Sequence, residues 1–540
     1  MNKKSFLLVL IVLFSVLGGL LLGNIIAHRA LLNDNLLSLS NSFLGRSSGN
    51  KVDDVLSIIN SQYVDTVDIH QMTEELTRDL IAKLDPHSMY IPAADLADVN
   101  SELEGSFSGI GIHFNIQEDT IMVISVIRGG PSEKIGLLAG DRIVEVNDTV
   151  FAGKNISDEK VRRKLRGVAG TIVKIGIKRN GTPELLHFEI TRGSIPVNSV
   201  TFAYMITPDV GFIGIDKFAM NTYAEFIQAI AGLRDKGAKK YIVDLRENTG
   251  GLMDQAINMV NEFMERGNLI VYSEGRAYPR IEARSDGRGS CINSPLVVLI
   301  DDFSASASEI FAGAVQDNDR GLIIGRRSFG KGLVQNQLPL SDGSAIRLTV
   351  ARYYTPSGRS IQKPYERGKS EEYEMDIINR YMNGEFFNAD SVHVKDSLTY
   401  TTVKGRTVYG GGGVMPDIFV PRDTTQYTSY LTKVINHGYL SQFAFQYTDR
   451  NREKLNKFKS WQELERYLNN QPLLTDFIAF ASAKGVSPNL KEINISKDFL
   501  LNGITAYIIR NTSGDEGFYP VFHKNDNVVQ RAVDEIKKIK

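Results

Sequence analysis

The run Leu296-Val297-Val298-Leu299-Ile300-Asp301-Asp302-Phe303-Ser304-Ala305-Ser306-Ala307-Ser308-Glu309-Ile310 joins a short apolar segment to a segment with helical spacing. The five aliphatic residues at its start predict a strand that is buried on both faces. The serine-rich part predicts a loop and then a helix from Ser306 to Gln316. A strand that leads through a short loop into a helix is the repeating unit of an α/β core.

Strands and helices alternate on both sides of this run, from Ile195 onward. The other predicted strands are 210–215, 240–245 and 322–325, and the other predicted helices are 223–236 and 253–265. We therefore predict an α/β core at residues 195–422. In such cores active groups gather in loops just past the strand ends, which is where Arg246–Gly251 and Ser304–Ser308 fall.

A candidate base follows the serine-rich loop in Phe329-Gly330-Lys331-Gly332-Leu333-Val334-Gln335, and no histidine lies between His187 and His393. A serine hydroxyl needs a base to take its proton, so the pattern predicts a serine–lysine hydrolase. The pKa of Lys331 would have to fall from about 10.4 to about 7–8, usually through burial. In an extended segment Lys331 and Gln335 project from one face, and the Gln335 amide oxygen can hold the amine.

Three serines compete for the role of nucleophile, namely Ser304, Ser306 and Ser308. Ser306 can instead be a helix N-cap with Glu309 three residues on, a capping box that needs no catalysis. A nucleophile at that position would benefit from the N–H of Ala307 and the positive end of the helix, which stabilise a developing oxyanion. The residues by themselves leave this choice open.

A second oxyanion donor is expected from Gly250 or Gly251, because a glycine pair after a strand exposes its amides to a substrate carbonyl. The pair can also simply turn the strand into a helix.

Two other motifs are weaker indications of a catalytic site. Ser157-Asp158-Glu159-Lys160 matches Ser-x-x-Lys, but neither Ser-Asp-Asn nor Lys-Thr-Gly occurs in the chain, and Asp85-Pro86-His87-Ser88 is interpreted as a turn that ends a helix.

Residues 101–194 change to short β-branched runs separated by turns, with a second helix predicted from Asp158 to Leu165. This order resembles a PDZ domain, with Gly109-Ile110-Gly111-Ile112 at the carboxylate-binding loop. Glycines let successive N–H groups converge on a terminal carboxylate, and the adjoining strand edge can take an extended peptide. A tight bend or bulge is the alternative interpretation of the four residues alone.

Taken together, the motifs resemble the carboxy-terminal processing (tail-specific) proteases. The likeness spans roughly residues 53–420, and it is carried by 84–88, 244–252, 304–310, 329–335 and 412–417 in fixed order behind the PDZ-like block. The resemblance implies that Ser306 is the nucleophile, Lys331 the general base and Gln335 the residue that orients the lysine. Glu247 and Thr249 depart from the Asn and Pro that the family often has in this loop.

The resemblance also implies an endopeptidase that recognises the free, preferably apolar C-terminus of protein substrates. Arg166, at the end of the second PDZ helix, resembles a family position that ties ligand occupancy to an active protease. A solvated charge at the helix end is the alternative. The rival function of a different class is a membrane-tethered PDZ scaffold or binding protein with an inactive hydrolase core.

The N-terminal sequence predicts the cellular compartment of the protein. Lys3 and Lys4 precede an apolar run from Phe6 to Ala27, which at roughly 20 residues is long enough to span a membrane. Ile25 stands where a cleavable signal would have a small residue, so we expect an uncleaved anchor. The lysines favour a cytoplasmic N-terminus, with the protease on the periplasmic side of a bacterial inner membrane.

The amino-acid composition limits the partners and cofactors that the protein is expected to bind. Of 540 residues, 62 are Lys or Arg and 63 are Asp or Glu, which gives no electrostatic reason to expect nucleic acid as a partner. The single Cys291 excludes a thiolate metal cluster, and we predict no metal and no cofactor. The helical region beyond Arg422 is either a module for homo-oligomerisation or a core packed on the protease. The predicted domains are 1–32 (transmembrane anchor or signal), 33–100 (tether and helical domain), 101–194 (PDZ-like), 195–422 (protease core) and 423–540 (C-terminal helical region).

Overall fold

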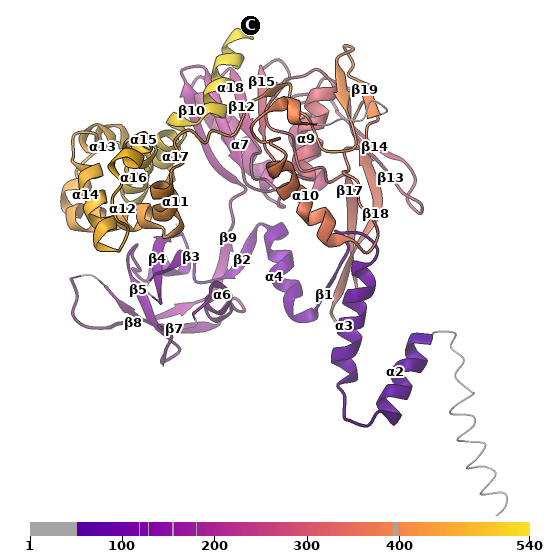
Figure 1. The fold of residues 1–540 in the computed structure, drawn as a ribbon, viewed down its shortest axis with the longest axis horizontal. Coiled ribbons are helices and arrows are strands. Elements are labelled where there is room, and N and C mark those ends of the chain that lie inside the picture. The colour runs from indigo at the N-terminus through magenta and orange to yellow at the C-terminus, as the bar shows by residue number, and fades with distance from the viewer. Residues whose placement is uncertain are drawn as a thin grey trace, which may run out of the picture. The chain divides into compact units, whose positions relative to one another are not determined.

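The computed structural model describes residues 51–117, 119–127, 129–153, 156–179, 181–392 and 398–539 (Figure 1). The predicted anchor at residues 6–27 lies outside these residues. Among the helices that are described, none is long and apolar enough to cross a membrane. The chain falls into two compact units, residues 1–77 and residues 78–540.

Two helices occur where apolar spacing predicts them in the N-terminal region. α2 (Lys51–Gln62) belongs to the first unit, and α3 (Ile69–Ala82) runs across the boundary into the second. No residue of α2 is buried. The Asp85–Ser88 turn ends the helical segment, as its proline and aspartate predict.

The central sheet of the second unit has six strands in the order β10-β11-β12-β15-β16-β21. Their bounds are β10 (Val200–Thr207), β11 (Val210–Ile215), β12 (Lys240–Asp244), β15 (Leu296–Ile300), β16 (Leu322–Gly325) and β21 (Ile418–Phe419). Only β10 pairs antiparallel. All five residues of β15 are buried, which confirms the strand predicted to be covered on both faces.

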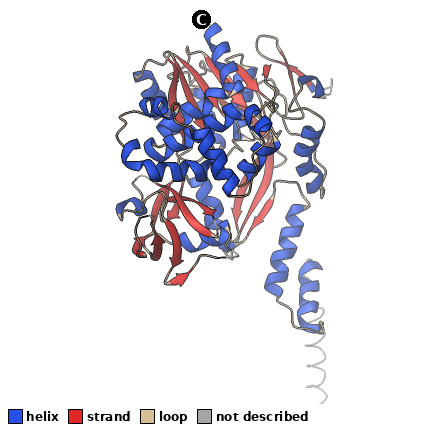
Figure 2. Cartoon of the chain, turned by 60° about the vertical axis from the view of Figure 1, so that its left-hand side comes forward, coloured by secondary structure: helices blue, strands red, loops and turns tan. Residues whose placement is uncertain are grey.

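Helices cover both faces of this sheet, as Figures 1 and 2 show. One face packs against α7 (Thr222–Asp235), α8 (Met253–Asn261) and α9 (Ala307–Asp317). The other packs against α18 (Asn527–Lys538) at the end of the chain. Because side chains alternate along a strand, each apolar strand supplies both layers of core.

A second, antiparallel sheet carries Gln335 and was not predicted from the sequence. Its strands are β1 (Met89–Ile91), β13 (Leu269–Glu274), β14 (Ile281–Arg284), β17 (Leu333–Pro339) and β18 (Ala345–Tyr354). β17 and β18 form a hairpin in which Gln335 pairs with Thr349. Helix α10 (Ser370–Met382) follows, and β19 (Thr399–Thr401) pairs with β20 (Thr407–Tyr409).

The β-rich domain has a core of its own. Its six-stranded sheet contains β3 (Ile112–Gln117), β4 (Thr120–Val126), β5 (Arg142–Val146), β6 (Thr149–Val150), β7 (Ile172–Lys178) and β8 (Leu186–Thr191), with helices α5 (Pro131–Lys134) and α6 (Asp158–Leu165). Helix α4 (Ala93–Glu104) leads into the domain, and the paired strands β2 (Ser106–Gly109) and β9 (Gly193–Pro196) form its entry and exit. The predicted fold class is therefore confirmed, with a PDZ-like domain inserted ahead of an α/β core.

The C-terminal helices also enclose their own core. They are α11 (Ser429–Asn436), α12 (Tyr439–Leu455), α13 (Trp461–Leu468), α14 (Leu473–Ala483), α15 (Leu490–Ile495), α16 (Lys497–Ser513) and α17 (Asp515–Phe522). The sequence grouped α18 with them, but the buried face of α18 belongs to the central sheet. Arg246, at the end of β12, forms ion pairs with Asp244 and with Asp526, the N-cap of α18.

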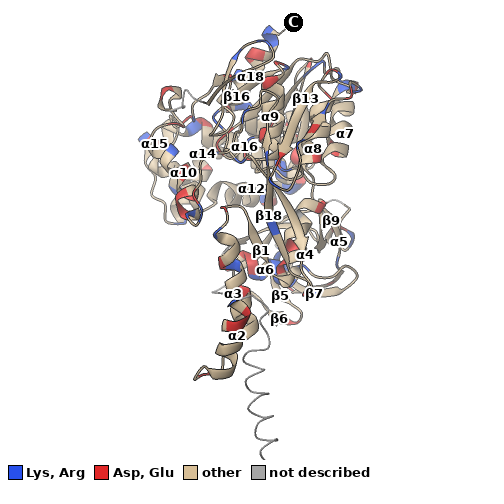
Figure 3. Ribbon diagram, turned by 90° about the vertical axis from the view of Figure 1, so that its right-hand side faces the viewer, with Lys and Arg blue, Asp and Glu red and all other residues tan. Residues whose placement is uncertain are grey.

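Lysine and arginine are interspersed with acidic residues along the chain (Figure 3). This distribution agrees with the near-balance of 62 basic and 63 acidic residues in the sequence.

Candidate active site

A cavity of about 450 Å³ lies where the end of the central sheet meets the β17–β18 hairpin. Ser306, Lys331 and Gln335 all line it, together with Gly250 and Gly251. Three segments that are far apart in the sequence therefore meet at one place. A larger cavity of about 1080 Å³ lies against β10 and contains none of these residues.

Ser306 stands at the N-cap of α9 with an unusual backbone, φ 56° and ψ −113°. A non-glycine residue in such a region costs roughly 1–3 kcal/mol and persists only where its surroundings hold it. Tyr353 supplies part of that hold, because its one hydroxyl hydrogen is shared between the carbonyl oxygens of Ser306, 3.0 Å away, and Lys331, 2.6 Å away. One buried tyrosine thus ties the serine loop to the lysine segment.

The other two serines of the loop are engaged elsewhere. Ser304 is buried, and its hydroxyl donates to the carbonyl oxygen of Leu245 at 2.7 Å. Ser308 is buried as well, and its hydroxyl donates to the carbonyl oxygen of Asn248 at 2.9 Å. Ser306 is the one of the three that lines the cavity.

Glu309 connects the two halves of the site. Its carboxylate accepts the N–H of Ser306 at 2.8 Å, which is the capping interaction predicted from the sequence. The same carboxylate accepts the N–H of Lys331 at 2.8 Å, the N–H of Gly330 at 2.7 Å and the hydroxyl of Ser328 at 2.5 Å. Burial raises the pKa of Glu309 to about 7, although the four donors oppose that rise. Sequence reasoning identified the cap and missed the other three contacts.

The side chain of Lys331 points its amine at Gln335, with Nζ 3.0 Å from Oε1. Burial lowers the pKa of Lys331, the positive charge of Arg347 lowers it further, and Glu309 and Asp85 act in the opposite direction. The expected hydrogen bond is therefore present, but the predicted cause, strand parity, does not apply. Lys331 precedes β17, and the register shifts between Val334 and Gln335, so strand parity does not align the two side chains.

The glycine pair after β12 lies against the serine loop. Added to Gly250, a Cβ would lie 2.7 Å from both the Ser306 Cβ and the Ala305 carbonyl oxygen, so only glycine fits. The N–H of Gly250 donates to the Asn248 side chain at 2.8 Å. In the described part of the chain, the N–H of Gly251 has no such acceptor.

The neighbouring residues complete this edge of the cavity. The N–H of Ala307, at the first position of α9, has no acceptor among the described residues either. Glu247 adopts φ 59°, and its N–H donates to buried Asp301 at 2.9 Å. The loop is therefore held by hydrogen bonds even though Glu247 and Thr249 depart from the family pattern.

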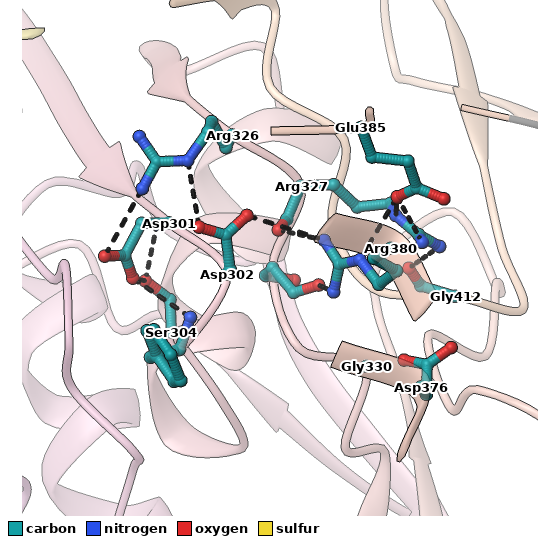
Figure 4. Close-up of polar contacts among 12 residues, drawn as sticks. Asp301, Asp302, Ser304, Arg326, Arg327, Gly330, Asp376, Arg380, Glu385 and Gly412 are labelled. Atoms are coloured by element: carbon teal, nitrogen blue, oxygen red, sulfur yellow. Dashed lines mark hydrogen bonds and ion pairs between the residues drawn. The ribbon is translucent and has the colours of Figure 1, made fainter. Parts of the chain in front are cut away.

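A network of buried charges supports both segments from behind (Figure 4). Asp302 accepts Arg326 Nε at 2.9 Å, which joins the start of the serine loop to the end of β16. Arg380 donates to the carbonyl oxygens of Ser328, at 3.0 Å, and of Arg327, at 2.7 Å. The segment that leads to Lys331 is thereby fixed from α10.

The predicted peptide-binding loop lies in the β-rich domain at Gly109–Ile112. The N–H groups of Ile110 and Gly111 meet no acceptor within the described ranges, as a carboxylate nest requires. The side chains of Ile110 and Ile112 are buried in the domain core, so they form the floor of this region. Arg166 lies beside the loop, with its guanidinium 4.6 Å from the centre of the Phe107 ring and 3.3 Å from Asp98 of α4.

The described residues contain no group of three or more His, Cys, Asp or Glu side chains that could hold a metal ion. Cys291 is buried, and that burial raises the pKa of its thiol. It lies in the core beneath α7 and α8, away from the cavity.

Comparison with known proteins agrees with the domain structure. Residues 209–370 match the model of peptidase family S41, residues 108–190 match a PDZ domain, and residues 430–514 match a family of unknown function, DUF8443. The carboxy-terminal-processing protease of Bartonella bacilliformis is 37% identical over 314 residues, which cover 57% of this chain and 71% of that protein. The carboxy-terminal processing protease CtpA of Bacillus subtilis is 33% identical over 373 residues, which cover 69% of this chain and 78% of that protein.

The chain is also similar to a solved structure. The photosystem II D1 C-terminal processing protease is 28% identical, with a TM-score of 0.37, and the match covers 70% of this chain and 88% of that one.

Proposed function

Because this chain belongs to the carboxy-terminal processing proteases of peptidase family S41, we propose that Ser306 and Lys331 form its catalytic dyad. The observation that carries the proposal is the pair of side chains in one cavity. The strained Ser306 is the one serine of the three that is not fully buried, and Lys331 is half-buried with a lowered pKa. A neutral amine beside a hydroxyl is the minimum that nucleophilic attack requires.

The reaction follows from these positions. Neutral Lys331 takes the proton of the Ser306 hydroxyl while Oγ attacks the carbonyl carbon of the scissile peptide bond. The resulting lysine ammonium gives that proton to the leaving amine, and the C–N bond breaks to leave an acyl-serine. Water then attacks the ester with Lys331 again as base, which releases the acid product and restores the serine.

The developing oxyanion needs two donors close to Ser306. We assign them to the N–H groups of Ala307 and Gly251, since both have no acceptor within the described part of the chain. Gly250 is the weaker candidate, because its N–H is already bound to Asn248. Its role is to allow close approach of the two loops.

Substrate selection belongs to the PDZ domain in this proposal. The N–H groups of Ile110 and Gly111, which have no acceptor among the described residues, bind the terminal carboxylate, and the edge of β3 takes the preceding residues as an added strand. Arg166 contacts α4, and Leu103 of the same helix lines the active-site cavity. Helix α4 is thus the element through which an occupied PDZ domain can act on the protease.

The proposed setting is the bacterial envelope, with residues 6–27 as an inner-membrane anchor and the protease in the periplasm. Its support is the lysine-flanked apolar run in the sequence. Envelope proteins with apolar C-termini would then be the substrates.

The test is cleavage of an unstructured protein that ends in a free apolar residue. Ser306→Ala and Lys331→Ala should each lower kcat/KM by at least about 1000-fold. Lys331→Arg should fail as well, because a guanidinium is not deprotonated in this pH range. Gln335→Ala should cause a severe but incomplete loss. Full activity in Lys331→Ala would exclude the dyad and leave a PDZ scaffold or a different base.

Recognition of the substrate's C-terminus by the PDZ domain has a separate test with the same substrate. Amidation of the substrate's C-terminus, or an Asp or Lys in its last position, should slow cleavage strongly because the carboxylate nest or the apolar groove is then left unsatisfied. Equal rates for the free and amidated substrates would exclude tail recognition without affecting the dyad.

A further inference from the structure

The turn Asp85-Pro86-His87-Ser88 lies directly against the residues that hold the candidate base. Within the turn, the Asp85 carboxylate accepts the N–H groups of His87 and Ser88, both at 2.9 Å, and the Ser88 hydroxyl at 2.6 Å. Burial alone would raise the pKa of Asp85, but these hydrogen bonds and one from Thr349 outweigh it, so the pKa lies below its ordinary value. The carboxylate is therefore charged and the turn is well defined.

The turn is fastened to β18 at one residue. The hydroxyl of Thr349 donates to Asp85 at 3.0 Å, and the N–H of Thr349 donates to the Ser88 hydroxyl at 3.0 Å. Thr349 is the strand partner of Gln335 in the β17–β18 hairpin. The turn is thus clamped opposite the residue whose amide contacts Lys331.

The main chain of the turn reaches the Gln335 side chain itself. The carbonyl oxygen of His87 accepts Gln335 Nε2 at 2.5 Å, and Gln335 Oε1 accepts Lys331 Nζ at 3.0 Å. A carbonyl oxygen has lone pairs and no hydrogen, so it can face only the NH₂ end of the amide. That leaves only the oxygen end for the lysine.

We infer that the Asp85–Ser88 turn is a positioning element for the base, acting through the His87 carbonyl on the Gln335 amide. With Oε1 toward it, the neutral amine must donate a hydrogen to Gln335, which turns its lone pair away from Gln335 and leaves it available to the cavity that Lys331 and Ser306 both line. A flipped amide would present N–H groups to Nζ and draw the lone pair away from the serine. This inference rests on the proposed role of Lys331 as base.

The ring of His87 has a structural part in this arrangement. Its Nε2 lies 2.9 Å from the hydroxyl of Tyr373, which accepts Gln362 Nε2 at 3.2 Å. The Oε1 of Gln362 in turn accepts the N–H of Gly332 at 2.8 Å, next to Lys331. Burial and then the charge of Lys331 lower the pKa of His87 to about 4, so the ring is neutral near pH 7. The side chain therefore steadies the turn, while its carbonyl oxygen supplies the contact with Gln335.

The inference is tested by a double-mutant cycle on the full chain. The clamp variant, Ser88→Ala with Thr349→Val, removes both side-chain links between the turn and β18 and changes no charge. It should lower kcat for a fluorogenic peptide with a free apolar C-terminus by about 10- to 100-fold, with little change in KM. In a Gln335→Ala background, the same pair of changes should cost less than about twofold, because the residue that they position is gone.

Two outcomes would overturn the inference. One is an unchanged kcat in the clamp variant, and the other is a loss of the same size with and without Gln335, which is the signature of a general structural defect. Where Gln335→Ala leaves too little activity, the pKa of Lys331 is read instead from the pH dependence of its acylation by acetic anhydride. The clamp variant and Gln335→Ala should then change that pKa by the same amount, and their combination should add nothing.

Controls separate this inference from folding and from the dyad. Thermal unfolding is followed for each variant, and Thr349→Val alone serves if the pair unfolds. Ser344→Ala removes a similar hydroxyl bond to an aspartate, Asp342, at the other end of the same hairpin, and it should keep kcat within about twofold. Loss of activity in Ser306→Ala and Lys331→Ala tests the proposed function independently, so failure of the dyad and failure of the turn are distinguishable.

Discussion

The candidate active-site cavity and the contact between the PDZ domain and α4 are built in opposite ways. At the cavity, fully buried Glu309 accepts four donors from two segments of chain. At the PDZ domain, Arg166 reaches Asp98 at 3.3 Å across a surface where the two side chains are 23% and 74% exposed. One arrangement is desolvated and densely bonded, whereas the other includes a partly exposed ion pair.

The difference matches the two tasks. Preorganised groups in a water-excluded site stabilise a transition state without reorganising during the reaction. An exposed ion pair is typically worth roughly 0.2–1 kcal/mol, so binding of a peptide can exchange it for another contact at little cost. We expect substitutions at the cavity to act on chemistry and substitutions at Arg166 to act on its regulation.

The largest effect on activity is expected from substitution of buried Glu309 at the cavity. Glu309→Gln keeps the size of the side chain but turns an NH₂ group toward backbone N–H donors of Ser306 or Lys331. We expect kcat to fall by about 100-fold through misplacement of both residues, and stability to fall by about 1–3 kcal/mol. Peptide cleavage and urea unfolding measure the two effects.

A matched control for this change is Glu262→Gln. Glu262 is also buried, and it accepts the hydroxyl of Tyr223 at 2.6 Å and the N–H of Ser290 at 2.7 Å, away from the cavity. It should lose stability but keep kcat. A normal kcat in Glu309→Gln would show that Glu309 only stabilises the fold. The proposed difference between the cavity and the PDZ contact would then not extend to catalysis.

An intermediate effect is expected at Arg347, which lines the cavity and is half-buried. Its positive charge lowers the pKa of Lys331, so Arg347→Gln should raise that pKa. In the proposed dyad the neutral amine is the active form, so activity should appear as pH rises through the pKa of Lys331. The low-pH limb of the kcat profile should therefore move up by at most about one pH unit, which is a tenfold loss below the limb.

A second variant, Arg347→Lys, tests whether the positive charge of residue 347 causes the shift in the pKa of Lys331. Arg347→Lys should keep the limb close to its wild-type position, and added salt should move the wild-type limb in the same direction as Arg347→Gln. A limb that moves to lower pH in Arg347→Gln would contradict the assignment of Lys331 as the titrating base.

The smallest effect on activity is expected from substitution of Arg166 at the contact between the PDZ domain and α4. Arg166→Ala should lower turnover of a tail-bearing protein by no more than about fivefold, and it should leave thermal stability unchanged. Acylation of Ser306 by a fluorophosphonate should keep its wild-type rate, since Arg166 does not reach the cavity. Asp98→Asn should have a similar effect if α4 carries the coupling.

A wild-type turnover in both variants would remove the switch while leaving the PDZ domain as a binding module. A large drop in fluorophosphonate labelling would instead show that the contact supports the active site directly, and the contrast between the two regions would need revision.

Local pattern was enough to predict most elements of the α/β core. The aliphatic run of β15 and the serine that caps α9 were both read correctly from neighbouring residues, because strand burial and helix capping depend on a few adjacent side chains. The second sheet was missed, since pairing of β18 with β1, β13 and β17 joins segments that are up to about 250 residues apart. The return of α18 to the central sheet was missed for the same reason.

By itself the sequence determined the fold class, the family and the candidate dyad, because these follow from residue types in fixed order along the chain. Only the tertiary structure decided which serine lines the cavity and which glycine N–H has no acceptor in the described part of the chain. The same holds for the four donors of Glu309 and for the His87 carbonyl that faces Gln335. The physical reason is that burial and backbone hydrogen bonds are properties of atoms brought together from distant segments, and every residue carries the same backbone N–H and C=O groups whatever its letter in the sequence.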